Sequence, residues 1–190
     1  MKILITGCLL LAFALTGAAN ATEPRHIFPD PAGEIEKLLQ SDEPPAGVVF
    51  DIEAWDEDAL DKHFPWLLEQ IPRLQDRYPD LPVAVVTHGR EQFQLTRDAR
   101  AEHRAAQAMV DDLAALGASV YVCNTHASWR GVPPEDFIDA VVVAESGPAA
   151  INDYIALGYE LVILDKIPLE QLMTLLPEDQ DPPDEYLNGR

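Results

Sequence analysis

Cys123 ends an apolar run and is followed at short spacing by two polar side chains that could act with it, His126 and Arg130. A thiolate is the reactive form of cysteine, and a nearby positive charge stabilises it. The segment 124–134 carries Arg130 and no acid, so it could supply that charge. The pattern indicates sulfur chemistry, in which a thiolate attacks another sulfur atom. The competing interpretation is a buried, inert cysteine.

Two further short segments carry candidate site residues. His88, Gly89 and Arg90 follow a second apolar run, where the histidine could be an acid–base partner or a hydrogen-bond donor. Ser146 and Gly147 follow another run and are typical of a helix cap and first turn, whose amides could face an anion. The structural alternatives are a hydrogen-bonded histidine at a strand–turn junction and arginines that coat a solvated surface.

Cys123 and His126 are also spaced as two ligands for a soft metal. Because the sequence offers no obvious further ligands beside them, we expect no metal and no cofactor. A Cys–His pair for acyl transfer would need an orienting acid and an oxyanion hole, which the sequence does not establish. No Walker-type loop or dinucleotide fingerprint follows an apolar run, so nucleotide binding has no support.

The elements that must position these residues alternate between apolar runs and helical patterns. The expected strands are residues 47–52, 81–87, 118–123, 140–144 and 159–164. Near-continuous apolar strands are typical of a sheet covered by helices on both faces. We therefore predict an α/β fold: a single-domain three-layer sandwich with a mostly parallel five-stranded sheet. Ligands of such sheets bind beyond the carboxyl ends of the strands, where the candidate residues fall.

Two of the expected helices have distinctive compositions. The helix over residues 60–78 contains Pro65 and Pro72, which should kink it, divide it or open a second piece. An Ala-rich helix is expected over residues 96–116. Its predicted inward face consists of Ala105, Met109, Leu113 and Leu116.

Residues 1–21 have the pattern of a secretory signal peptide: a lysine near the start, an apolar stretch, and Ala-Asn-Ala before the cleavage point. Cleavage would remove Cys8 and leave Cys123 alone in an oxidising compartment, where an unpaired cysteine is unusual. We therefore expect a periplasmic location, with no membrane attachment after cleavage.

The predicted domain lies between two polar flanks. Residues 22–45 form a polar leader punctuated by prolines and broken by one short helical piece. Residues 177–190 form an acidic tail that is expected to be disordered. The α/β domain is therefore expected to span residues 46–176.

The chain carries 33 Asp and Glu against 13 Lys and Arg, a formal net charge of -20. Recognition of phosphates needs clustered basic residues, so this balance argues against nucleic acid as a partner and against anionic membrane surfaces. Residues 88–104 and 121–134 are exceptions, because each segment has a small positive net charge. The acidity therefore belongs to the flanks and outer faces, and the candidate edge is locally basic.

Three runs resemble the DsrE/DsrF-like family, which includes sulfur-relay and sulfur-oxidation proteins. They are AVVTHGREQFQLT (84–96), ASVYVCNTHASWRGV (118–132) and VVVAESGPAAINDYIALGYELV (141–162). The resemblance extends over residues 46–166. It implies a small α/β fold with a mostly parallel five-stranded sheet, and a homo-oligomer, commonly a trimer or hexamer.

The resemblance also implies roles for individual residues. Sulfur-transferring members carry a persulfide on a cysteine after the third strand, and Cys123 matches that position. His88-Gly89 matches the family's histidine-glycine after the second strand. Ser146-Gly147 begins a turn that matches the small-residue turn after the fourth strand.

Three hypotheses follow. In the first, a periplasmic sulfur-trafficking protein accepts sulfur on Cys123 and passes it to a partner thiol, while His88, His126 and Arg130 hold the anionic sulfur or its donor. In the second, the chain is a non-catalytic oligomeric binding or assembly module with an inert cysteine. In the third, Cys123 and His126 form a metal or redox sensor.

Overall fold

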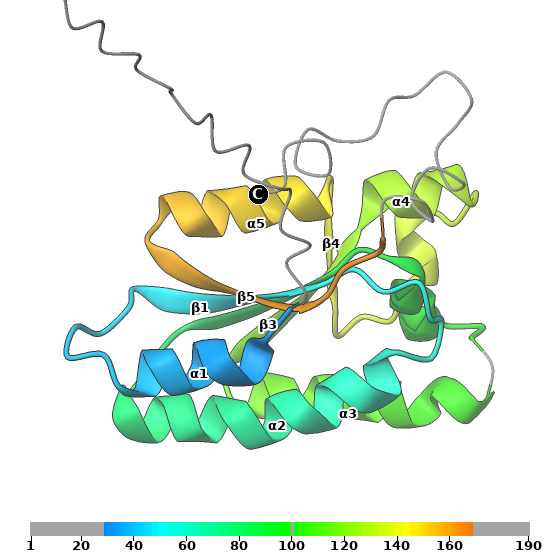
Figure 1. Cartoon of the computed structure of the whole chain (residues 1–190). Coiled ribbons are helices and arrows are strands. Elements are labelled where there is room, and N and C mark those ends of the chain that lie inside the picture. Colours follow the sequence, from blue (N-terminus) through cyan, green and yellow to red (C-terminus); the bar gives the residue numbers. More distant parts are fainter. Residues whose placement is uncertain (1–28, 100, 169–190) are drawn as a thin grey trace, which may run out of the picture.

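Five parallel strands form one sheet in the order β4–β3–β2–β1–β5 (Figure 1). The computed structural model describes residues 29–99 and 101–168. The strands are β1 (Gly47–Ile52), β2 (Val83–Thr87), β3 (Ala118–Cys123), β4 (Val142–Ala144) and β5 (Tyr159–Asp165). The predicted α/β fold with a five-stranded parallel sheet is confirmed.

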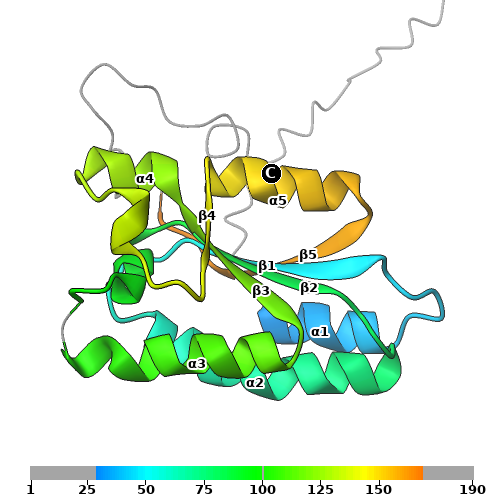
Figure 2. The same cartoon turned by 180° about the vertical axis from the view of Figure 1, so that it is seen from behind.

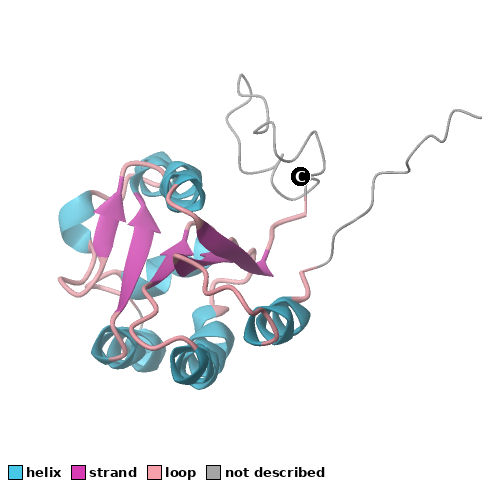
Figure 3. Ribbon diagram, turned by 90° about the vertical axis from the view of Figure 1, so that its left-hand side faces the viewer, coloured by secondary structure: helices cyan, strands magenta, loops and turns pink. Residues whose placement is uncertain are grey.

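Helices cover both faces of the sheet (Figures 2 and 3). On one face lie α1 (Pro31–Leu39), α2 (Leu60–Arg77) and α3 (Arg104–Ala115), and on the other lie α4 (Asn124–Trp129) and α5 (Gly147–Ala156). Three short 3₁₀ turns complete the described part: η1 (Arg90–Leu95), η2 (Ala101–His103) and η3 (Pro134–Asp136). The sheet is therefore the middle of three layers.

The two faces of the sheet bury two separate apolar clusters. Val48, Phe50 and Ile52 of β1 belong to the large cluster, which also includes the inner residues of α2 and α3. Val49 belongs to a small cluster with Ile151 of α5. Successive side chains of a strand point to opposite faces of the sheet. Asp51, His88 and Cys123 therefore lie on the same face as the small cluster, which is the α5 side.

Of the alternatives predicted for residues 60–78, a divided helix and a separate second piece are wrong, because α2 is one helix that contains both Pro65 and Pro72. Each internal proline removes a backbone hydrogen bond and costs about 3 kcal/mol. The helix buries a continuous apolar face: Leu60, Phe64, Leu67, Ile71 and Leu74 are all fully buried. Burial of one such side chain contributes about 1.5–3 kcal/mol, so the face offsets the lost bonds.

The predicted start of the Ala-rich helix is also wrong, because α3 begins at Arg104 rather than at Thr96. Thr96 instead forms a bridge with Phe137, and the backbone N–H of Arg97 donates to the carbonyl of Asp136 at 2.7 Å. The bridge holds the backbone of Thr96 in an extended conformation, which a helix cannot include. The inward face of α3 is shifted accordingly: Ala106, Val110 and Leu113 are buried and Ala105 is exposed.

The amino-terminal part of the described chain packs against the domain. Helix α1 begins at Pro31, where the Asp30 side chain accepts the Gly33 N–H at 3.0 Å, and Ile35 is fully buried. The Tyr78 hydroxyl donates to the Leu38 carbonyl at 2.7 Å. The predicted signal peptide (1–21) and acidic tail (177–190) lie outside the described residues. Within the described residues, none of the helices has the length and apolar character needed to cross a membrane.

Candidate functional site

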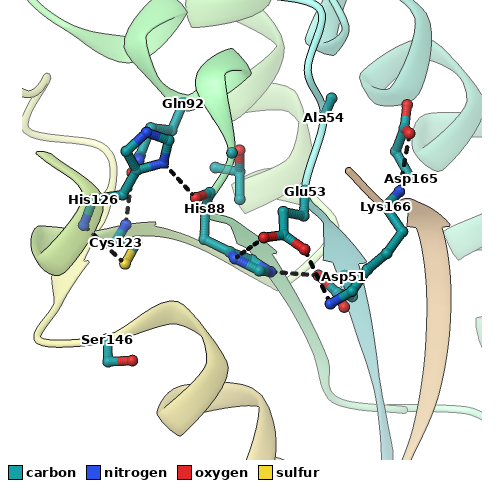
Figure 4. A network of polar contacts seen from close by, with 12 residues as sticks. Asp51, Glu53, Ala54, His88, Gln92, Cys123, His126, Ser146, Asp165 and Lys166 are labelled. Carbon is teal, nitrogen blue, oxygen red and sulfur yellow. Dashed lines mark hydrogen bonds and ion pairs between the residues drawn. The ribbon is translucent and has the colours of Figure 1, made fainter. Parts of the chain in front are cut away.

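Four of the predicted site residues, His88, Cys123, His126 and Ser146, lie near the carboxyl ends of the strands (Figure 4). Ile52 of β1 pairs with Thr87 of β2, and Thr87 pairs with Val122 of β3. The next residue of each strand is therefore Glu53, His88 and Cys123, side by side across three strands. The first residues of α5 complete this edge: a Cβ atom at Gly147 would lie 2.5 Å from the Cβ of His88.

Cys123 is buried, with an exposed fraction of 3%, and both its backbone and its sulfur are hydrogen-bonded. Its N–H donates to Oε1 of Gln92 at 2.8 Å. Its Sγ accepts the backbone N–H of His126 at 3.5 Å, so the thiol caps α4. Figure 4 shows the sulfur on the side of the edge where Ser146 lies. The cysteine is thus fixed by the two segments that follow β2 and β3.

His88 is the centre of a buried charged cluster, defined here as Asp51, Glu53, His88 and Lys166. Nε2 of His88 lies 2.7 Å from Oδ1 of Asp51, and Nδ1 lies 3.9 Å from Oε1 of Glu53. Nζ of Lys166 lies 3.0 Å from the other oxygen of Glu53. In this cluster, which we call the His88 cluster, each of the two carboxylates faces at least one cation.

The cluster controls the protonation of its members. Burial alone would lower the pKa of His88, but the charge and hydrogen bond of Asp51 and the charge of Glu53 outweigh it and raise the pKa to about 9. Burial raises the pKa of Glu53, opposed by His88 and Lys166. His88 is therefore a cation at neutral pH, and both of its ring N–H groups point at carboxylates. With both nitrogens directed at carboxylates, the ring offers no free base to Cys123.

Glu91 fixes the loops that carry the cluster. Its buried carboxylate accepts the N–H of Ala54 at 2.8 Å, the N–H of Gly89 at 3.0 Å, and the hydroxyl of Thr87. Burial raises its pKa to about 7, against the Thr87 hydrogen bond and the charge of His88. A Cβ atom at Gly89 would lie 2.5 Å from the backbone N and O of Ala54, so the close approach of these loops requires glycine.

His126 lies on the other side of Cys123 and has a different environment. Its Nδ1 lies 2.8 Å from the carbonyl oxygen of His88, which can only accept, so Nδ1 carries the proton. Burial lowers the pKa of His126, opposed by this hydrogen bond, so the ring is neutral and Nε2 is unprotonated. The centroid of its ring lies 5.4 Å from the ring centroid of Phe93 and 5.6 Å from that of Trp129. Figure 4 shows it directed away from the sulfur of Cys123.

Arg90 and Arg130, both predicted as site residues, converge on one carboxylate. Nε of Arg90 lies 3.1 Å and Nη1 of Arg130 lies 3.4 Å from the same oxygen, Oε1 of Glu57. Each guanidinium also covers an aromatic ring: Arg90 covers Trp55 at 4.8 Å and Arg130 covers Phe93 at 4.6 Å. The hydrogen bond from Arg90 and then the charges of both arginines lower the pKa of Glu57. The arginines therefore meet at Glu57, not at the sulfur.

Ser146 begins α5 as predicted. Its Oγ accepts the N–H of Ala149 at 3.4 Å, and Gly147 occupies the first helical position. The end of β4 is joined to α4 nearby, because both the N–H and the hydroxyl of Thr125 donate to the carbonyl of Glu145, at 3.1 and 2.7 Å. The two helices on this face thus start from neighbouring points on the edge.

Sequence reasoning missed the partners that hold the predicted residues. Gln92, Glu91 and Phe93 all belong to η1, a segment without apolar periodicity. Glu57 lies in an irregular acidic segment that has no distinguishing signal. Asp51 had a signal, since an acid within the otherwise apolar strand β1 indicates a buried charge with a partner.

Among the described residues, no three His, Cys, Asp or Glu side chains are grouped so that they could hold a metal ion. Cys123 and His126 do not form a pair of ligands, because the sulfur faces the backbone of His126 and the ring faces the carbonyl of His88. That a cofactor is not required stays a prediction.

The fold and the edge define an α/β protein with a five-stranded parallel sheet and a cysteine capping a short helix after the third strand. No family model matches the chain, and no curated protein matches it. Solved structures do match. A protein of unknown function from Methanobacterium thermoautotrophicum, MTH1491, has 21% identity and a TM-score of 0.50, covering 61% of this chain and 96% of that one.

The ychN protein from E. coli has 15% identity and a TM-score of 0.48, over 62% of this chain and 98% of its own. At these identities the comparisons describe the fold alone. The match with MTH1491 supports the α/β fold, one parallel sheet flanked by helices.

Proposed function

We propose that this chain is a periplasmic sulfur-trafficking protein that carries a persulfide on Cys123. The observation that carries the proposal is the position of the sulfur: it lies at the carboxyl edge of a parallel sheet, where Cys123 is the strand neighbour of His88, and it accepts the backbone N–H of His126 at the start of α4. A backbone donor at the start of a helix stabilises anionic sulfur. A DsrE/F-like fold supports the same function.

The transfer step is a thiol–polysulfide exchange. The sulfur of Cys123 attacks the terminal sulfur of a polysulfide, so a new S–S bond forms on Cys123 as an S–S bond in the donor breaks. The electron pair and the thiol proton leave with the shortened polysulfide. A partner thiolate then attacks the outer sulfur of the persulfide, regenerates the Cys123 thiol and carries the sulfur away. No external oxidant or reductant is needed.

The burial of Cys123 sets a condition on this chemistry. Since only 3% of the residue is exposed, a donor reaches the sulfur when α4 or the start of α5 moves aside. Helix α4 is short, and only His126 and Ala127 of this helix are buried, while Trp129 is 41% exposed. Elements with few buried apolar contacts open most readily, which makes α4 the expected path of access.

The test is the intact mass of the chain after incubation with polysulfide, with and without a low-molecular-weight thiol added later. We expect a gain of one sulfur atom that is lost on thiol addition and is absent from Cys123→Ser. An unmodified wild-type chain under conditions that modify the unfolded chain would overturn the proposal and favour a binding or assembly module with an inert cysteine. Size-exclusion chromatography with light scattering tests the expected trimer or hexamer.

A further inference from the structure

The two arginines at the edge share a single carboxylate, which leaves one positive charge uncompensated at that point. Arg90 and Arg130 both contact Oε1 of Glu57. They come from η1 and from the residue that ends α4, so two separate elements direct guanidinium groups to the same place. Two guanidinium groups around one oxygen form the arrangement that proteins use to bind oxyanions.

The arginines are held in position by contacts other than Glu57. Arg90 lies over the ring of Trp55, and Arg130 lies over the ring of Phe93. Such stacking restricts the long side chains, so their donors stay convergent if the carboxylate leaves. Both guanidinium groups remain partly exposed, 26% for the Arg90 side chain and 34% for Arg130, so a solute can reach them.

The other acids of this segment have partners elsewhere. Asp56 accepts the N–H of Asp58 at 3.1 Å, and the Asp58 side chain contacts His103 at 2.8 Å. Glu53 faces His88 and Lys166 in the His88 cluster. Glu57 is therefore the acid that these contacts assign to the arginine pair.

We propose that Arg90 and Arg130 form a binding site for a small dianionic oxyanion such as sulfate or thiosulfate, which Glu57 occupies as an internal competitor when the ligand is absent. A dianion matches the two guanidinium charges, whereas the carboxylate of Glu57 matches only one. The site is connected to Cys123 through η1, because Gln92 holds the backbone of Cys123 and Phe93 contacts both Arg130 and His126. Its role as a docking site for a sulfur donor rests on the proposed function, but binding itself needs no reaction at Cys123.

The experiment is a titration of the chain with sodium sulfate and sodium thiosulfate, followed by the indole N–H resonances of the tryptophans in ¹⁵N–¹H NMR spectra. Trp55 reports on the site because Arg90 covers it, and Trp66, which packs on Phe50, is the internal reference. Sodium chloride at equal ionic strength separates binding from screening. We expect a saturable shift at Trp55 with either dianion and little change at Trp66.

Glu57→Gln removes the internal competitor while it keeps the size of the side chain. It should tighten the apparent dissociation constant about three- to tenfold, as expected for the release of two partly exposed ion pairs. Asp56→Asn is the matched control, because it removes the same charge one residue away without freeing an arginine. Adding Arg130→Gln to Glu57→Gln should abolish the saturable shift.

An equal gain in Asp56→Asn, or no gain in Glu57→Gln, would overturn the proposal, as would shifts that chloride reproduces. Cys123→Ser separates this proposal from the proposed function, since it should bind dianions like the wild type. Binding without persulfide formation on the wild-type chain would leave the oxyanion site in place and remove the sulfur function. Persulfide formation without dianion binding would support the sulfur function and overturn the oxyanion site.

Discussion

The carboxyl edge of the sheet contains two regions that differ in how their polar groups are paired. In the His88 cluster, buried charges face one another: Asp51 and Glu53 surround His88, and Lys166 closes the far side. Around Cys123, by contrast, polar groups could form more hydrogen bonds than they do. The sulfur accepts one long hydrogen bond, and the Nε2 of Gln92 is buried without a hydrogen-bond partner among the described residues.

This difference distinguishes residues that stabilise the fold from residues that could take part in a reaction. A buried network of paired charges rigidifies a fold, and removal of one member exposes its partners to a large desolvation cost. Substituting a group that has few hydrogen-bond partners costs less stability. Such a group can also form a new hydrogen bond to a ligand. We therefore expect substitutions in the His88 cluster to act on stability, and substitutions near Cys123 to act on reactivity.

The largest expected effect is that of His88→Leu. This substitution removes the ion-pair partner of Asp51 and one of the cations that face Glu53, inside the protein. Removing one partner of a buried ion pair costs about 3–5 kcal/mol in the free energy of unfolding, measured by urea denaturation. His88→Gln, which keeps a donor toward Asp51, should lose less and serves if the leucine variant does not fold.

The control for His88→Leu is Lys37→Gln, which breaks an exposed ion pair with Glu34, where the side chains are 78% and 49% exposed. It should leave stability nearly unchanged, because exposed pairs contribute little. If His88→Leu were equally harmless, the cluster would not be a scaffold and the contrast between the two regions would fail.

The second prediction concerns pH. The pKa of His88 is raised from 6.5 to about 9, so the stability linked to its proton is complete below pH 6.5 and is lost as the pH rises through 9. The size of the effect is about 3 kcal/mol. The pKa of Glu91 is raised from 4.5 to about 7, so it adds a loss of stability in the same direction at lower pH, between 4.5 and 7.

Urea denaturation from pH 5 to pH 9.5 should therefore show a falling free energy of unfolding. Glu91→Gln should flatten the lower part of the curve and His88→Gln the upper part. The measurements belong in a Cys123→Ser background, which removes the free thiol. A profile that stays flat in that background between pH 6.5 and 9 would contradict the charged state assigned to His88.

The third prediction compares two neighbouring glutamines. Oε1 of Gln92 accepts the N–H of Cys123 and Oε1 of Gln94 accepts the N–H of Leu60, at 2.8 and 2.9 Å, and both side chains are buried. Replacing either by leucine leaves a backbone donor unpaired, so each should cost about 1–3 kcal/mol. Only Gln92→Leu should speed the alkylation of Cys123, because only it loosens the end of β3.

Alkylation rates are measured in the native chain with an excess of iodoacetamide, at a urea concentration well below the unfolding transition. Gln94→Leu is the matched control, with equal burial and the same element. Equal rates in the two variants would mean that Cys123 becomes reactive through global unfolding, and the region around it would then be as rigid as the His88 cluster.

The fold was predictable because its strands carry strong local signals. The apolar runs that became β1, β2 and β3 are short, β-branched and bounded by turn residues. The errors concern elements decided by long-range contacts. Burial of one face keeps α2 whole across two prolines, and contacts with η3 delay the start of α3.

The sequence allowed only the location of the site to be predicted, at the ends of neighbouring strands. Parallel strands bring Cys123, His88 and Gly147 to one edge whatever their partners are. Which group pairs with which depends on side chains far apart in the sequence, such as Arg130 and Glu57, 73 residues apart. A six-residue segment such as η1 carries no periodicity, so its role in holding Cys123 could not be read from the sequence.

The smallest predicted effect concerns the two helix caps at this edge. Ser146 caps α5 with a hydroxyl and Cys123 caps α4 with a thiol. Ser146→Ala should cost about 0.5–1 kcal/mol by urea denaturation, since the first turn of α5 loses its acceptor. Cys123→Ser should cost less, because a hydroxyl accepts the His126 N–H at least as well as sulfur does. If Cys123→Ser costs more than Ser146→Ala, then the sulfur stabilises the fold by apolar packing rather than by capping, and Cys123 belongs with the scaffold instead of the chemistry.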